Sequence, residues 1–83
     1  MKESIEAEAH IEIEYSDEKT ARTIAKAVSP DNIETELIKV DSYAHENKLI
    51  IKIVCKKNVG SLLATIDDIL FSIQTAEKAL KEI

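Results

Sequence analysis

The chain has 83 residues, so we expect residues 1–83 to form one small domain. Hydrophobic residues make up 45% of the sequence and charged residues 33%, a balance typical of a globular protein rather than a disordered one. Eleven basic and sixteen acidic residues give a net charge of −5. This charge makes the isolated chain a poor ligand for nucleic acid, because binding to phosphates depends on basic side chains.

The sequence shows no apolar run of membrane-spanning length, and residues 1–4 carry no apolar signal segment. We therefore expect a cytoplasmic protein with no membrane association. The single cysteine, Cys55, cannot form an internal disulfide bond. A domain of this size buries only about 60% of its unfolded surface, so oligomerisation would strengthen a marginal core.

The first predicted element is a strand over residues 5–15, because apolar and polar side chains alternate strictly there. One face of this strand carries Ile5, Ala7, Ala9, Ile11, Ile13 and Tyr15, and the other carries Glu6, Glu8, His10, Glu12 and Glu14. A helix capped by Ser16 or Asp17 is expected next. Its apolar residues recur at helical spacing: Ala21, Ile24, Ala25 and Val28. Pro30 predicts the end of this helix, in a turn over residues 29–32.

Two further strands are expected over residues 34–43 and 48–56, joined as a hairpin by residues 44–47. If Glu46 and Asn47 form the turn, the pairs across the hairpin are Val40 with Ile53, Ile38 with Cys55, and Asp41 with Lys52. After Gly60 and Ser61, a long amphipathic helix is predicted from Leu62. Its apolar residues alternate in steps of four and three: Leu62, Ile66, Ile69, Ile73, Ala76, Leu80 and Ile83.

The order strand, helix, strand, strand, helix predicts an α+β fold of the β-α-β-β-α type. Because the third strand, over residues 48–56, is the most apolar, we place it in the centre of a three-stranded antiparallel sheet with order 1-3-2. Both helices then lie on one face, as in a ferredoxin-like half-sandwich that lacks its final strand.

The predicted central strand is apolar on both faces, which leaves a group of hydrophobic residues on the side of the sheet away from the helices. The predicted members of this group are Leu37, Tyr43, Ile50 and Val54. We interpret this strand side as a homodimer interface, because the small size of the chain and the extra apolar patch favour self-association. The alternative is a set of scattered surface hydrophobes, which are common on any protein.

A second candidate surface lies on the outer faces of the two helices, where small residues replace the usual lysines and glutamates. In the long helix this face carries Ala64, Asp67, Asp68, Phe71, Ser72 and Thr75, and in the first helix Thr20, Thr23 and Ala27. Small residues allow another helix to approach closely, and Phe71 would serve as an anchor. The alternative is an edge-buried phenylalanine on an unremarkable surface.

We find no set of residues with the types and spacing of a catalytic site in the sequence. We therefore predict neither an enzyme nor a cofactor or metal site. His10 with Glu8 and Glu12 offers three alternating ligands, but a solvated charged face is the better interpretation. Cys55 is expected in the core. Asp67 and Asp68 point about 100° apart on a helix, so they would not share a proton.

A small RNA-binding or other protein-interaction module of ferredoxin-like type remains the alternative function. Two specific RNA-binding folds are disfavoured, however. A KH domain needs a Gly-x-x-Gly loop, and the chain has one glycine. An RRM needs aromatic residues on its central strands and a fourth strand. An enzyme whose site forms between two protomers is the other rival, with His10 as its candidate residue.

Three stretches carry a resemblance to a known family: the acidic strand and its exit over residues 11–18, the Ser-Pro-Asp-Asn turn over residues 29–32, and the helix opening over residues 61–70. Together they resemble the small Pcc-type (CTAG/Pcc family) subunit of the KEOPS complex, which makes threonylcarbamoyladenosine in tRNA. The likeness extends over nearly the whole chain. Leu63 replaces the arginine usual in that family, and Asp67 replaces its usual asparagine.

This resemblance implies a non-catalytic scaffold role. Members of the family form a dimer and hold the catalytic threonylcarbamoyltransferase subunit through their two helices, so the resemblance implies a homodimer that binds this subunit. It implies contact with tRNA only within the assembled complex. The partner-binding residues expected on the helix faces are Thr20, Thr23, Ala27, Leu63, Ala64, Asp67, Phe71 and Thr75, and no residue is expected to be catalytic.

Overall fold

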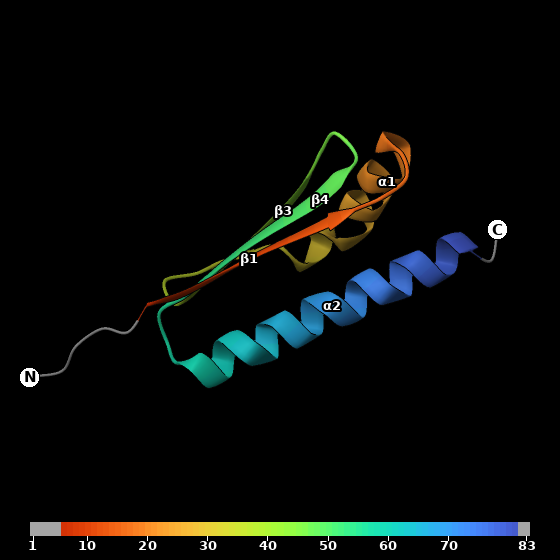
Figure 1. The fold of residues 1–83 in the computed structure, drawn as a ribbon. Coiled ribbons are helices and arrows are strands. Elements are labelled where there is room, and N and C mark those ends of the chain that lie inside the picture. The colour runs from red at the N-terminus through yellow and green to blue at the C-terminus, as the bar shows by residue number, and fades with distance from the viewer. Residues whose placement is uncertain (1–5, 82–83) are drawn as a thin grey trace, which may run out of the picture.

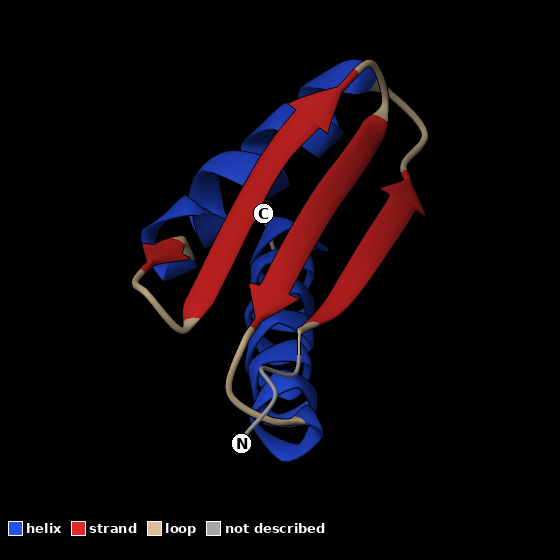
Figure 2. Cartoon of the chain, turned by 90° about the vertical axis from the view of Figure 1, so that its left-hand side faces the viewer, coloured by secondary structure: helices blue, strands red, loops and turns tan. Residues whose placement is uncertain are grey.

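The computed structural model describes residues 6–81, which form one antiparallel sheet with two helices on one of its faces (Figures 1 and 2). The strands are β1 (Ala7–Glu14), β2 (Ile33–Glu34), β3 (Ile38–His45) and β4 (Lys48–Cys55). The helices are α1 (Glu18–Val28), a short 3₁₀ turn over Ser29–Asp31, and α2 (Val59–Lys81). The predicted apolar positions Ile5 and Ile83 lie outside the described residues.

The sheet has four strands in the order β1-β4-β3-β2, so the predicted number of three strands is wrong. The predicted order 1-3-2 corresponds to β1-β4-β3 and is confirmed. The additional strand, β2, has two residues and pairs with the edge of β3. The predicted second strand fails to continue through Thr35, because the backbone turns there: the Thr35 hydroxyl accepts from the amide nitrogens of Leu37 and Ile38. A two-residue strand gives too little alternation to be recognised in a sequence.

The predicted hairpin register is confirmed at all three pairs: Val40 with Ile53, Ile38 with Cys55, and Asp41 with Lys52. The turn is Glu46-Asn47, with Glu46 in the left-handed region at a φ of 57°. β3 is two residues longer at the turn than predicted, because it continues to His45, whereas β4 begins at Lys48 as predicted.

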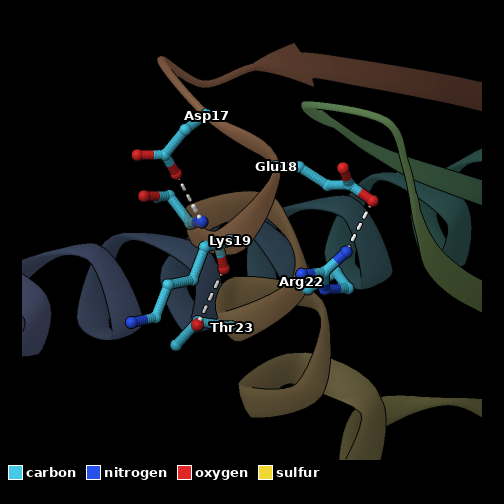
Figure 3. Close-up of polar contacts among 6 residues, drawn as sticks. Asp17, Glu18, Lys19, Arg22 and Thr23 are labelled. Carbon is cyan, nitrogen blue, oxygen red and sulfur yellow. Dashed lines mark hydrogen bonds and ion pairs between the residues drawn. The ribbon is translucent and has the colours of Figure 1, made fainter.

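Helix α1 begins where the sequence places its cap. The Asp17 carboxylate accepts a hydrogen bond from the Thr20 backbone nitrogen at 2.7 Å, and this bond lowers the pKa of Asp17 (Figure 3). The predicted inward residues of α1 are all buried: Ala21, Ile24, Ala25 and Val28.

Helix α2 begins at Val59, three residues before the predicted start. Its cap is Asn58, whose side-chain oxygen accepts from the Ser61 backbone nitrogen at 2.7 Å. The predicted stripe faces the sheet, with Leu62, Ile69 and Ile73 buried and Ile66, Ala76 and Leu80 half-buried against the core.

The core lies between the sheet and the helices and is centred on β4. Leu49, Ile51, Ile53 and Cys55 are each at most 1% exposed, as expected for the central strand. Near the C-terminal end of α2, the Tyr15 hydroxyl donates to the Glu77 carboxylate at 2.5 Å. Burial, together with this hydrogen bond, raises the pKa of Tyr15. The bond fixes α2 alongside β1, and it therefore determines which flank of the helix faces the edge of the sheet.

Candidate protein-interaction surfaces

The four predicted strand-side residues, Leu37, Tyr43, Ile50 and Val54, lie on the outer face of the sheet, but they differ in exposure. Ile50 is only 8% exposed, whereas Leu37 and Tyr43 are 49% and 38% exposed. Ile50 lies in register between Tyr43 and Glu12. The outer face therefore offers two separated apolar side chains rather than a continuous patch.

Charged residues occupy much of the rest of this outer face. Lys52 lies in register between Asp41 and His10, and its ammonium is 5.9 Å from the centre of the Tyr43 ring. His10 Nε2 lies 3.1 Å from a Glu12 oxygen, and Lys48 Nζ lies 4.0 Å from the other Glu12 oxygen. These contacts make the outer face a mixed polar surface, as a solvated antiparallel sheet requires.

Strand β1 forms the free edge of the sheet, with no described element beside it on the side away from β4 (Figure 2). Half of its backbone groups therefore point outward without a strand partner. Its inward side chains alternate with the exposed ones and are only half-buried: Ala7, Ala9, Ile11 and Ile13. This edge was not predicted as a site, although the predicted order 1-3-2 already placed the first strand at an edge.

One flank of α2 extends the apolar surface of this edge. Leu63, Leu70 and Glu77 follow at seven-residue spacing, which places them in one row along the helix. Because Glu77 contacts Tyr15 at the end of β1, this row lies on the β1 side of α2. Leu63 is 56% exposed and Leu70 is 37% exposed. We define the edge surface as β1 together with Leu63 and Leu70.

A second surface lies on the outer face of α2, around Phe71, which is 69% exposed. Ala64, Asp67 and Thr75 are exposed on the same side of the helix, as the sequence predicts. Leu63 does not join them, because it lies in the row that faces β1. Phe71 also lines a groove of about 440 Å³, together with Pro30 and Ile33.

Thr20, Thr23 and Ala27 lie along one side of α1, where Thr20 is half-buried and the other two are exposed. Basic residues share the outer face of the helix with them. Lys19, Arg22 and Lys26 line a hollow together with Thr23 and Ala44 of β3. We define the helix surface as Thr20, Thr23 and Ala27 together with Ala64, Asp67, Phe71 and Thr75.

Two threonines of the helix surface keep their hydroxyl groups within their own helices. The Thr23 hydroxyl donates to the Lys19 carbonyl at 2.8 Å, as drawn in Figure 3, and the Thr75 hydroxyl donates to the Phe71 carbonyl at 2.9 Å. Because these donors are satisfied, the two threonines need no polar partner and can present their methyl groups outward. Apart from Phe71, the helix surface consists of short side chains, with Asp67 as its charged member, and this allows a helix to pack closely against it.

The described residues 6–81 contain no cluster of three metal-ligating side chains. His10 and Glu12 form an exposed pair on the sheet, and Cys55 is buried, with its thiol 3.5 Å from the Asn58 carbonyl oxygen. Asp67 and Asp68 are both exposed on consecutive positions of α2. These arrangements bring no nucleophile and base together.

Helix α2 is long and apolar enough to cross a membrane by length and composition alone. In the fold it is instead an amphipathic helix, whose stripe of Leu62, Ile69 and Ile73 packs on the sheet. Only a small share of its most apolar segment is buried, so the helix keeps apolar surface that the described chain does not cover. This excess is found at the helix surface and at the edge surface.

A comparison with protein families matches residues 8–81 to the Pcc1 model, which is described as "Transcription factor Pcc1". The chain belongs to the Pcc1 family. It is therefore a non-catalytic subunit of the KEOPS complex, which modifies tRNA, and this confirms the family resemblance and the prediction that the chain is not an enzyme.

The solved structures include a similar chain in the crystal structure of the binary complex Gon7-Pcc1. It superposes with a TM-score of 0.79 at 22% sequence identity, over 90% of this chain and 93% of that chain. This likeness supports the fold described above. No curated protein matches the chain.

Proposed function

We propose that this Pcc1-family chain is a scaffold subunit with two separate binding surfaces. The helix surface holds the catalytic threonylcarbamoyltransferase subunit of KEOPS, and the edge surface joins a second strand-bearing subunit. The observation that supports this proposal is the apolar surface left uncovered on two sides of α2, at Phe71 and at Leu63, which lie about 80° apart around the helix. A lone domain of 83 residues has no need for either side chain in its core.

The helix surface suits a helical partner. Phe71 provides one large exposed aromatic side chain, the residue type most often found at the energetic centre of an interface. On α2, Ala64 and Thr75 flank it with short side chains that do not block a second helix, and Thr23 and Ala27 present short side chains on α1. The groove at Pro30 and Ile33 offers further apolar contact.

For the second subunit, the edge surface is a better candidate than the outer face of the sheet. A strand added beside β1 would pair its free backbone groups and cover the half-buried Ile11 and Ile13 together with Leu63 and Leu70. On the described outer face, Leu37 and Tyr43 are the exposed large apolar residues, and Val54 is half-buried. A second copy of the chain is the partner predicted from the sequence.

The contribution to catalysis is geometric. Joining two subunits through one small domain raises the effective concentration of each near the other. We place the scaffold in the cytoplasm and take residues 1–83 as one Pcc1-type domain without a cofactor.

Contact with tRNA, the alternative raised by the sequence, is best placed within the assembled complex. The basic face of α1, formed by Lys19, Arg22 and Lys26, offers phosphates a local positive surface. Three basic side chains on a chain of net charge −5 are too few for strong binding in isolation.

Size-exclusion chromatography with light scattering tests the proposal. The purified chain is expected to elute in a stable complex with the catalytic subunit and to show no threonylcarbamoyl transfer by itself. Separate elution of the two proteins at micromolar concentrations would refute the scaffold role.

A further inference from the structure

Exposed charges of opposite sign lie on the two sides of Phe71 along α2. At 100° and 1.5 Å per residue, Asp67 lies about 6 Å before Phe71 and Lys78 about 10 Å after it, both within about 40° of it around the helix. Asp68 and Lys81 extend the two groups toward the borders of this stripe. All four charged side chains are exposed, and none of them forms an ion pair within the described residues 6–81. We call this arrangement, acidic before Phe71 and basic after it, the charge order of α2.

The stability of the helix itself accounts for only the basic half of the charge order. Lys78 and Lys81 lie in the last turn of α2, where the helix dipole favours a positive charge. Asp67 and Asp68 lie in the middle of the helix, whereas the dipole favours acidic residues in the first turn, which contains none in α2. The positions three and four residues away from both aspartates hold no lysine or arginine that could pair with them. The two carboxylates therefore have no evident role in stabilising α2.

Two grooves beside Phe71 carry the same difference in charge. Asp68 lines the groove of about 440 Å³, together with apolar side chains that include Ile33. A second groove of about 450 Å³ is lined, beside Phe71, by Gln74, Thr75, Glu77, Lys78 and Lys81. The carboxylate of Glu77 already accepts the hydrogen bond from Tyr15, so the lysines offer the unpaired charges there. A partner side chain would meet apolar surface and a carboxylate in the first groove, and ammonium groups in the second.

We propose that the helix surface selects a helix whose charges have the complementary order: lysine or arginine beside Asp67 and Asp68, and aspartate or glutamate beside Lys78. This inference rests on the helix surface of the proposed function and names the chemistry of the catalytic-subunit segment that lies on it. Phe71 and the apolar groove provide the attraction. The charges determine the direction in which the partner helix lies along α2, because the reversed helix would bring like charges together.

Two neutralised variants distinguish the charge order from a general attraction between proteins of opposite net charge. D67N/D68N removes two negative charges and K78Q/K81Q removes two positive charges, so they change the net charge of −5 in opposite directions. Titration calorimetry with the purified catalytic subunit at low ionic strength is expected to show binding weaker by about threefold or more for both variants. Both losses should fall below about twofold at about 1 M salt, because exposed charges are then screened.

Matched controls make the same changes in charge away from α2. E6Q/E8Q alters the start of β1, and K56Q/K57Q alters the loop between β4 and α2; all four side chains are exposed. Both controls should bind the catalytic subunit within about twofold of the wild-type chain, because they lie outside the helix surface. Circular dichroism checks the fold of all four variants, each of which changes exposed residues only.

Three results would overturn the inference in different ways. Weaker binding of D67N/D68N with tighter binding of K78Q/K81Q, or the reverse, would show that net charge governs the association. Unchanged binding of both variants would remove the charge order but leave the helix surface standing, since Phe71→Asp tests that surface separately. No binding by the wild-type chain would overturn the proposed function and this inference together.

Discussion

Replacing Phe71 with aspartate is expected to weaken binding of the catalytic subunit by about 30-fold or more, because a central aromatic anchor contributes about 2 kcal/mol or more to an interface. The fold should persist, since Phe71 is 69% exposed and lies outside the core. An aspartate there would replace the aromatic anchor with a charge at the centre of the contact, beside the carboxylate that Asp67 already contributes. Titration calorimetry with the purified catalytic subunit measures the change.

The matched control is the same kind of change on the other flank of α2. Leu63→Asp also replaces an exposed apolar side chain with a carboxylate, at a residue that is 56% exposed. It should leave the affinity for the catalytic subunit within about twofold, because Leu63 lies in the row facing β1. Equal losses in the two variants would remove the distinction between the helix surface and the edge surface.

Leu63→Asp is expected to have its large effect on strand pairing. In self-association of the chain through the edge surface, this substitution should weaken association about tenfold or more. Burying an unpaired carboxylate under an added strand or helix is costly. Sedimentation equilibrium measures the loss, and Phe71→Asp is the control. If association is lost with Phe71→Asp but kept with Leu63→Asp, self-association uses the helix surface and not the edge surface, which contradicts the account.

Most of the fold could be predicted because its signals are local and repeated. Strict alternation identified β1, a short helical stripe with the Asp17 cap identified α1, and the position of Glu46 and Asn47 set the hairpin register. The apolar character of β4 was enough to place it in the centre, because only a strand covered on one face and flanked on both edges buries so many residues.

The remaining features depend on contacts between distant residues, which a periodic pattern does not report. Strand β2 has only two residues and is defined by pairing with β3. The bond from Tyr15 to Glu77 joins residues 62 positions apart, and it orients α2 so that Leu63 faces β1 rather than joining Phe71. A helical wheel separates these two side chains, but it cannot show which neighbour each flank meets.

Helical spacing gives the exposure of the side chains around Phe71, because that exposure depends on the position of each residue within one helix. The exposure of the strand-side residues depends on neighbouring strands as well. Ile50 is buried between its register partners Tyr43 and Glu12, whereas Leu37 and Tyr43 are exposed. The edge surface leaves no mark in the alternation of side chains, because its unpaired groups belong to the backbone of β1.

Hydrogen–deuterium exchange of the chain, free and bound to the catalytic subunit, tests the central claim most directly. The account predicts slower exchange on binding in peptides from α1 and α2, with no change in β1. Slower exchange in β1 with unchanged helices would contradict it.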